Sequence, residues 1–204
     1  MHKRVWIAIL SVALAAFAVV PAGADVSAFV AMVGFDDEAN LNSSPGVGLR
    51  WGKSSGFIGG ETSLMLTRPE RDLPGQEGAN ATALFYEGRV VVNIPVGEIT
   101  PFVDAGFGWI TVTSTDVVEE GLPDNELEAL QAVADLQTKS AFSYGAGVRY
   151  SLSDRMDLRV DLRQYQVFSV AGVAVQAAAA AADVEAKDNT VQYSELSAGV
   201  VIRF

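Results

Sequence analysis

The sequence contains no cysteine, and its single histidine is the second residue. The absence of cysteine excludes disulfides, thiolate metal sites and cysteine nucleophiles. From residue 25 onward there is no histidine, the usual general base of a serine hydrolase. A pair of carboxylates is an alternative acid–base device, but we expect no enzymatic activity, no cofactor and no metal site.

Positive charge is also scarce. The chain has 14 Lys and Arg against 25 Asp and Glu, a net charge of −11. If Lys3 and Arg4 are removed with the amino-terminal segment described next, 12 basic residues face 25 acidic ones and the net charge is −13. A nucleic acid backbone requires a basic surface, so we exclude nucleic acid as a partner.

Long apolar runs are confined to the amino terminus. A basic region at residues 2–4 precedes the uncharged stretch Val5–Val20, and Ala22-Gly23-Ala24 follows as a small-residue cleavage site. This pattern predicts a signal peptide over residues 1–24, cleaved after Ala24, and one mature domain over residues 25–204. A retained anchor is disfavoured because 16 apolar residues fall short of the roughly 20 that span a bilayer.

The mature chain instead shows apolar residues at every second position. Counting back from Phe204, the apolar residues Ile202, Val200, Ala198 and Leu196 alternate with a set that is polar or small except for Val201. Side chains of a strand alternate between faces, so this segment has an apolar and a largely polar face. Similar alternation predicts eight strands, at residues 25–35, 45–53, 56–66, 81–94, 100–113, 140–152, 156–168 and 191–204.

The connections between these strands alternate in length. Tight turns follow the second, fourth and sixth strands, and longer segments occupy residues 36–44, 67–80, 114–139 and 169–190. A sandwich with Greek-key connections has no reason to sort its loops in this way. We therefore predict an all-β fold, an eight-stranded antiparallel transmembrane β-barrel with short periplasmic turns and longer extracellular loops.

The predicted inward positions carry equal numbers of positive and negative charges. They are Arg50, Glu61, Glu87, Arg89, Asp104, Arg149, Asp157, Arg159, Asp161, Arg163, Glu195 and Arg203. Unpaired buried ions cost several kcal/mol each, so we expect these side chains to form a salt-bridge network in the lumen. The first strand has no charge in its middle to fix its register, which stays open.

At this point the chain resembles the small eight-stranded outer-membrane β-barrel family, which includes the OmpA transmembrane domain and OmpW-like proteins. The matching stretches are 100–109, 144–155 and the strand that ends in Phe204. The resemblance implies an exported protein of the Gram-negative outer membrane that contacts the lipid bilayer and lipopolysaccharide. It also implies that the assembly machinery reads the carboxy-terminal strand, through Leu196, Ala198, Val200, Ile202 and Phe204.

Two interpretations of the lumen follow from its size. Eight strands enclose a space that side chains just fill, which favours a plugged barrel with a structural or surface-interaction role. The alternative is a narrow channel for small or hydrophobic solutes. We expect a monomer.

The two longest loops offer further hypotheses. Residues 117–139 are acidic and have helical spacing, which suggests a site for a surface partner or, as an alternative, for Ca²⁺. Residues 170–182 contain six consecutive alanines, which favour a second short helix.

Overall fold

A computed structural model of the protein describes residues 24–54, 56–72, 79–114, 137–168 and 191–204. The strands are β1 (Asp25–Phe35), β2 (Ser44–Lys53), β3 (Ile58–Thr67), β4 (Ala81–Asn93), β5 (Ile99–Ser114), β6 (Gln137–Ser153), β7 (Met156–Phe168) and β8 (Val191–Ile202), with a 3-10 turn η1 (Asp37–Ala39) after β1. No helix in this part of the chain is long and apolar enough to cross a membrane.

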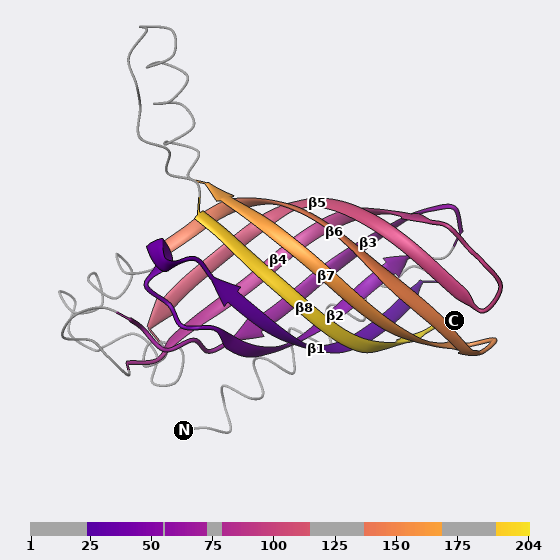
Figure 1. The fold of residues 1–204 in the computed structure, drawn as a ribbon, viewed down its shortest axis with the longest axis horizontal. Coiled ribbons are helices and arrows are strands. Elements are labelled where there is room, and N and C mark those ends of the chain that lie inside the picture. Colours follow the sequence, from indigo (N-terminus) through magenta and orange to yellow (C-terminus); the bar gives the residue numbers. More distant parts are fainter. Residues whose placement is uncertain (1–23, 55, 73–78, 115–136, 169–190) are drawn as a thin grey trace, which may run out of the picture.

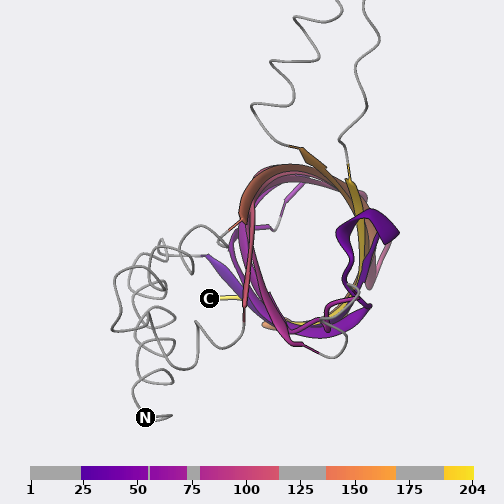
Figure 2. The same ribbon diagram turned by 90° about the vertical axis from the view of Figure 1, so that its left-hand side faces the viewer.

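The strands close into a ring in chain order. Each strand pairs antiparallel with the next, and β1 pairs with β8 from Val26↔Ile202 to Phe35↔Tyr193. Figure 1 shows the tilted strands from the side, and Figure 2 looks along the barrel into the closed ring. The predicted eight-stranded antiparallel barrel is confirmed.

The two rims of the barrel differ in their connections. One rim, here called the turn end, carries the short links 54–57, 94–98 and 154–155. The other, the loop end, carries the links 36–43, 68–80, 115–136 and 169–190. The helices expected in the two longest loops, and the predicted signal peptide except for Ala24, lie outside the described residues.

Alternating burial follows the pleat of every strand. On β7 the odd positions from Asp157 to Val167 are buried, whereas Leu158, Val160 and Leu162 are exposed to the outside. The outward residues around the ring are mostly apolar, as a surface in contact with lipid hydrocarbon requires. The inward face predicted for each of the seven strands other than β1 is therefore the observed one.

The structure also fixes the register of β1. Ser27, Phe29, Ala31 and Val33 are buried inside the barrel, and Ser27 pairs with Arg50 on β2. Asp25, at the first position of β1, is the only charged residue among its inward side chains, so the pattern of charges gave little signal for the inward face.

The bounds of β1 and β7 are those predicted, the other strands differ by one to three residues at an end, and the largest shifts at the start of a strand are in β6 and β3. β6 begins at Gln137, three residues before the predicted 140, because the hairpin with β5 continues to the pair Val112↔Gln137. β3 begins at Ile58 rather than 56, because Gly56 has φ of 101° and belongs to the turn.

Inner glycines make room for two phenylalanine rings. A Cβ atom added to Gly147 would meet the ring of Phe102 and the carbonyl oxygen of Val160. An added Cβ atom on Gly48 would meet the ring of Phe29, and one on Gly199 would meet the Cβ and Cα atoms of Phe29. Arginines lie against two further inner glycines, Arg89 against Gly106 and Arg163 against Gly145. Gly108 instead lies against the Tyr86 carbonyl oxygen and Glu87.

We predict that Gly147→Ala destabilises the barrel by about 1–3 kcal/mol, because the added methyl group overpacks the interior against Phe102. The control is Gly88→Ala, since Gly88 faces outward with no atom within 4 Å of an added Cβ. Urea unfolding in lipid vesicles measures both variants. If the two variants have the same unfolding free energy, the close packing around Phe102 is not important for stability.

Candidate functional site: the charged interior

The predicted lumen residues come together on the inner wall of the barrel. β2 supplies Arg50, β3 supplies Glu61, and the other strands from β4 to β8 supply most of the rest. All are buried except Arg203, which follows β8 at the turn end and keeps 33% of its side chain exposed. Alternation explains this convergence, because each residue lies an even number of positions from its neighbours on the same strand.

Arg159 is the centre of the network. Its Nη1 and Nη2 atoms donate to Glu61 on β3 at 2.7 and 2.8 Å, a bidentate pair across the barrel. The same guanidinium donates to Asp161, two residues along β7, at 2.7–3.1 Å. Such forked arginine–carboxylate pairs are among the strongest hydrogen bonds in proteins.

Arg50 extends the network to β8. It donates to Asp161 at 3.0 Å, to Glu195 at 2.8 Å and to the hydroxyl of Ser197 at 2.7 Å. Asp161 therefore accepts from Arg50 and Arg159 at once and joins β2 to β7, while Arg50 also reaches β8 through Glu195 and Ser197.

Arg163 lies one level closer to the loop end. It contacts Asp104 at 3.1 Å, Glu87 at 3.3 Å and Glu195 at 3.3 Å, on three different strands. Two hydroxyl groups complete this level: Tyr165 donates to Glu195 at 2.5 Å, and Ser143 donates to Glu87 at 2.6 Å.

Arg89 has carboxylates nearby without good alignment. Its Nη2 atom lies 3.0 Å from Glu61 and its Nε atom 3.5 Å from Glu87, yet none of its N–H groups makes a hydrogen bond in the described structure. These contacts are ionic, and Arg89 serves to balance two carboxylates that other arginines hold in place.

The turn end holds a smaller polar group. Arg203 pairs with Asp157, and both contact the hydroxyl of Ser151. Arg149 makes no ion pair among the described residues; it donates to the carbonyl oxygen of Ser54 at 2.8 Å. Arg149 was predicted to join the salt-bridge network, but its hydrogen-bond partner is a backbone carbonyl group and not a carboxylate.

Sequence reasoning missed three members of this interior. Asp25 is buried and accepts from the backbone N–H and hydroxyl of Ser54 at 3.1 and 3.0 Å. The rings of Phe29 and Phe102 lie under guanidinium groups, Arg50 at 3.7 Å and Arg159 at 4.5 Å from the ring centroid. Cation–π contacts of this kind stabilise a charge that is removed from water. Of these three residues, only Phe102 could have been assigned to the interior from the sequence, because it lies two positions before the inward residue Asp104 on the same strand.

The loop-end half of the interior is apolar. A cluster of buried side chains from seven strands fills it: Phe29, Ala31, Val33, Met65, Ala83, Phe85, Ile110, Ala141, Tyr165, Val167, Val191 and Tyr193. Phe85 packs edge to face with Tyr165 and Tyr193, at centroid distances of 5.3 and 6.3 Å. The interior thus has a charged level and an apolar level, where the sequence analysis considered charges only.

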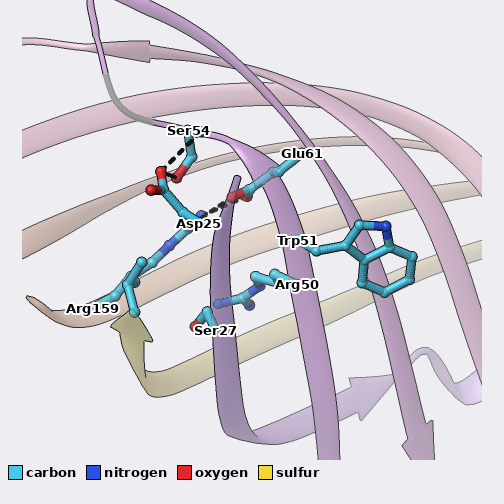
Figure 3. A pocket seen from close by; sticks show the side chains of 8 residues that line it. Asp25, Ser27, Arg50, Trp51, Ser54, Glu61 and Arg159 are labelled. Atoms are coloured by element: carbon cyan, nitrogen blue, oxygen red, sulfur yellow. Dashed lines mark hydrogen bonds and ion pairs between the residues drawn. The ribbon is translucent and has the colours of Figure 1, made fainter. Parts of the chain in front are cut away.

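The charged level is tightly packed. Figure 3 shows the indentation between Asp25, Ser54, Glu61 and Arg159 near the turn end, with the Trp51 ring turned away from these side chains. It has no space for a molecule the size of water. Among the described residues no group of three or more acidic or histidine side chains has the arrangement of a metal site.

We expect Arg159→Ala to destabilise the barrel by about 3–5 kcal/mol, because it leaves Glu61 and Asp161 buried without their main partner. The matched control is Arg155→Ala, whose side chain is exposed in the turn between β6 and β7 and contributes at most about 1 kcal/mol. Urea unfolding in lipid vesicles compares the two. Equal effects would show that the interior is hydrated and that its ion pairs contribute little.

Comparison with known proteins supports this architecture. Neisserial surface protein A is 13% identical, with a TM-score of 0.58, over 89% of this chain and 97% of that one. Outer membrane protein W of E. coli is 13% identical over 89% and 97%, with a TM-score of 0.46. The outer membrane enzyme PagL is 20% identical over 88% and 99%, with a TM-score of 0.47. A search of curated protein sequences found no match.

At 13% identity the similarity to Neisserial surface protein A shows a shared fold and not a shared activity. The family model for the outer membrane protein beta-barrel domain matches residues 5–204, nearly the whole chain. Both strand topology and the apolar outer surface agree with that match. The chain therefore belongs to the outer membrane protein β-barrel domain family, whose members reside in the outer membrane of Gram-negative bacteria.

Proposed function

We propose that this protein is a plugged barrel with a structural or surface-interaction role, and that it presents acidic extracellular loops. The observation that carries the proposal is the ion-pair network, which crosses the interior from β3 to β7 through Arg159 and Glu61. A permeating ion would have to displace buried pairs that contact one another at 2.7–3.4 Å. The apolar cluster above them adds a second barrier to ions.

Any interaction of the protein at the cell surface would depend on the connections at the extracellular end of the barrel. In the family's plan the loop end is extracellular and the turn end is periplasmic. Most of the net negative charge of the mature chain belongs to the loop-end connections, with residues 115–136 the most acidic. We infer that a surface partner would meet these acidic segments first, and that this partner carries positive charge.

The alternative function is a narrow channel for small or hydrophobic solutes. The apolar loop-end interior is the observation in its favour, since Phe85, Ile110 and Tyr193 would suit an apolar solute. Below them the paired charges at Arg163 and Glu195 would stop such a solute. The plugged barrel is therefore the better supported function.

We predict that the purified barrel in a planar lipid bilayer gives no reproducible open conductance level. The double variant Arg159→Ala/Glu61→Ala, which removes both charges of one pair and two large side chains, should give brief openings by comparison. Reproducible steps from the native barrel, or uptake of an apolar solute by vesicles that contain it, would contradict the plug and favour the channel.

The carboxy-terminal strand presents the residues expected to act as an assembly signal. Leu196, Ala198, Val200, Ile202 and Phe204 all face outward, and Phe204 is 77% exposed. A row of outward apolar residues with an aromatic end can be recognised by a partner without opening the barrel's interior. We propose that the assembly machinery reads this row.

Phe204→Ala should reduce the amount of folded barrel in the outer membrane several-fold while leaving the unfolding free energy within about 0.5 kcal/mol, as expected for an exposed site. Phe57→Ala is the matched control, because Phe57 is 68% exposed but lies in the turn between β2 and β3. Resistance of the folded barrel to protease in membrane fractions measures assembly. A similar loss in both variants would mean that the terminal position has no special role.

A further inference from the structure

The outer surface of the barrel carries a polar patch within its apolar face. Across neighbouring strands the pairing aligns Phe107, Phe142, Gln166 and Gln192 on β5, β6, β7 and β8. The adjacent row, nearer the turn end, continues from Tyr144 to Gln164 and Ser194. Along these rows the outward side chains are aromatic on β5 and β6, and they are amides and a hydroxyl on β7 and β8. We call Gln164, Gln166, Gln192 and Ser194 the amide patch.

Most hydrogen-bonding groups of the amide patch have no partner among the described residues. Gln164 donates to Gln192 at 3.4 Å, and the side chains of Gln166 and Ser194 make no hydrogen bond within the described part of the chain. Each amide offers two N–H donors and a carbonyl acceptor. Polar groups that face a membrane without partners are costly, so the patch is suited to a polar partner from outside the barrel.

The chemistry of the patch favours one kind of partner. No Lys, Arg, Asp or Glu is among the outward residues of three strands: β1 from Val26 to Gly34, β7 from Met156 to Phe168, and β8 from Gln192 to Ile202. A phosphate-bearing lipid headgroup would find no cation there. An amide, which both donates and accepts, is complementary to another amide. The same patch on a second copy supplies that complement through two-fold symmetry.

Beyond the exposed row of Leu162, Leu196 and Met32, the surface along β8 and β1 permits a close approach. On β8 and β1 the outward side chains beneath Leu196 and Met32 are short: Ala198, Val200, Ala28 and Val30. Small side chains let two membrane-embedded surfaces pack at short range, which strengthens both dispersion and hydrogen bonding. The large outward aromatic residues Phe107, Trp109 and Phe142 instead lie on β5 and β6.

We propose that two copies of this chain associate side by side in the membrane through the face formed by β7, β8 and β1, with the amide patches hydrogen-bonded to each other. These three strands lie next to one another on the near side of the barrel in Figure 1. From the sequence we had expected a monomer; the pair follows from where the fold places Gln164, Gln192 and Ser194. The proposal is independent of whether the lumen is plugged.

The absence of cysteine makes disulfide cross-linking a clean test. Ser194→Cys lies within the proposed interface, and Leu84→Cys, on the outward face of β4 across the ring, is the control. The full-length protein is oxidised with copper phenanthroline in its own membranes. We expect a covalent dimer from Ser194→Cys and none above background from Leu84→Cys. Equal cross-linking at both positions, or none at either, would overturn the proposal.

A second measurement tests the amides themselves. The triple variant Gln164→Leu/Gln166→Leu/Gln192→Leu adds apolar groups to a surface in contact with lipid, so the barrel should fold normally. Loss of several interfacial hydrogen bonds should weaken dimerisation about tenfold in sedimentation equilibrium with lipid-like detergent micelles. A native protein that sediments as a monomer, as expected if the patch contacts only lipid headgroups, would refute the dimer. So would a triple variant that dimerises like the native protein.

Discussion

Twelve charged side chains share the interior of this barrel with almost no access to water, and they are tolerable there only because nearly all of them are paired. Arg159, Arg50 and Arg163 each contact two or more carboxylates, and these come from strands far apart in the sequence. Asp161 accepts from Arg50 and Arg159 together. The network therefore acts as a set of cross-links between opposite walls, and loss of one arginine leaves buried carboxylates unpaired.

The small bore of an eight-stranded ring explains the other features of the interior. Large guanidinium groups fit beside aromatic rings only where the facing residue is glycine, as with Gly147 under Phe102. Above the charged level the same space is filled by Phe85, Tyr165 and Tyr193. Because Tyr165 also donates to Glu195, one side chain joins the apolar level to the charged one. A packed interior with two such levels is the basis of our proposal that the barrel supports its loops and does not provide a path through the membrane.

The exterior of the barrel differs from strand to strand. The lipid-facing surface is uneven, with aromatic residues on β5 and β6 and uncharged amides on β7 and β8. Stacked and edge-to-face contacts join the aromatic residues, such as Phe107 with Trp109 at 6.0 Å. Among the described residues these amides make a single hydrogen bond, between Gln164 and Gln192, which is the basis of the proposed association with a second copy.

The sequence alone was sufficient to predict the number of strands, their pairing as a closed antiparallel ring and the inward face of seven of them. The reason is physical: strand alternation is a local property, and a chain without cysteine or a long mature apolar run has few other ways to bury its apolar residues. Balanced charge at the inward positions also indicated which residues would share the lumen. Which carboxylate meets which arginine depends on the shear of the ring and was decided only in three dimensions. The inward face of β1, the place of Phe29 under Arg50 and the gathering of Gln164, Gln166, Gln192 and Ser194 were decided there too, because each depends on contacts between segments far apart in the sequence.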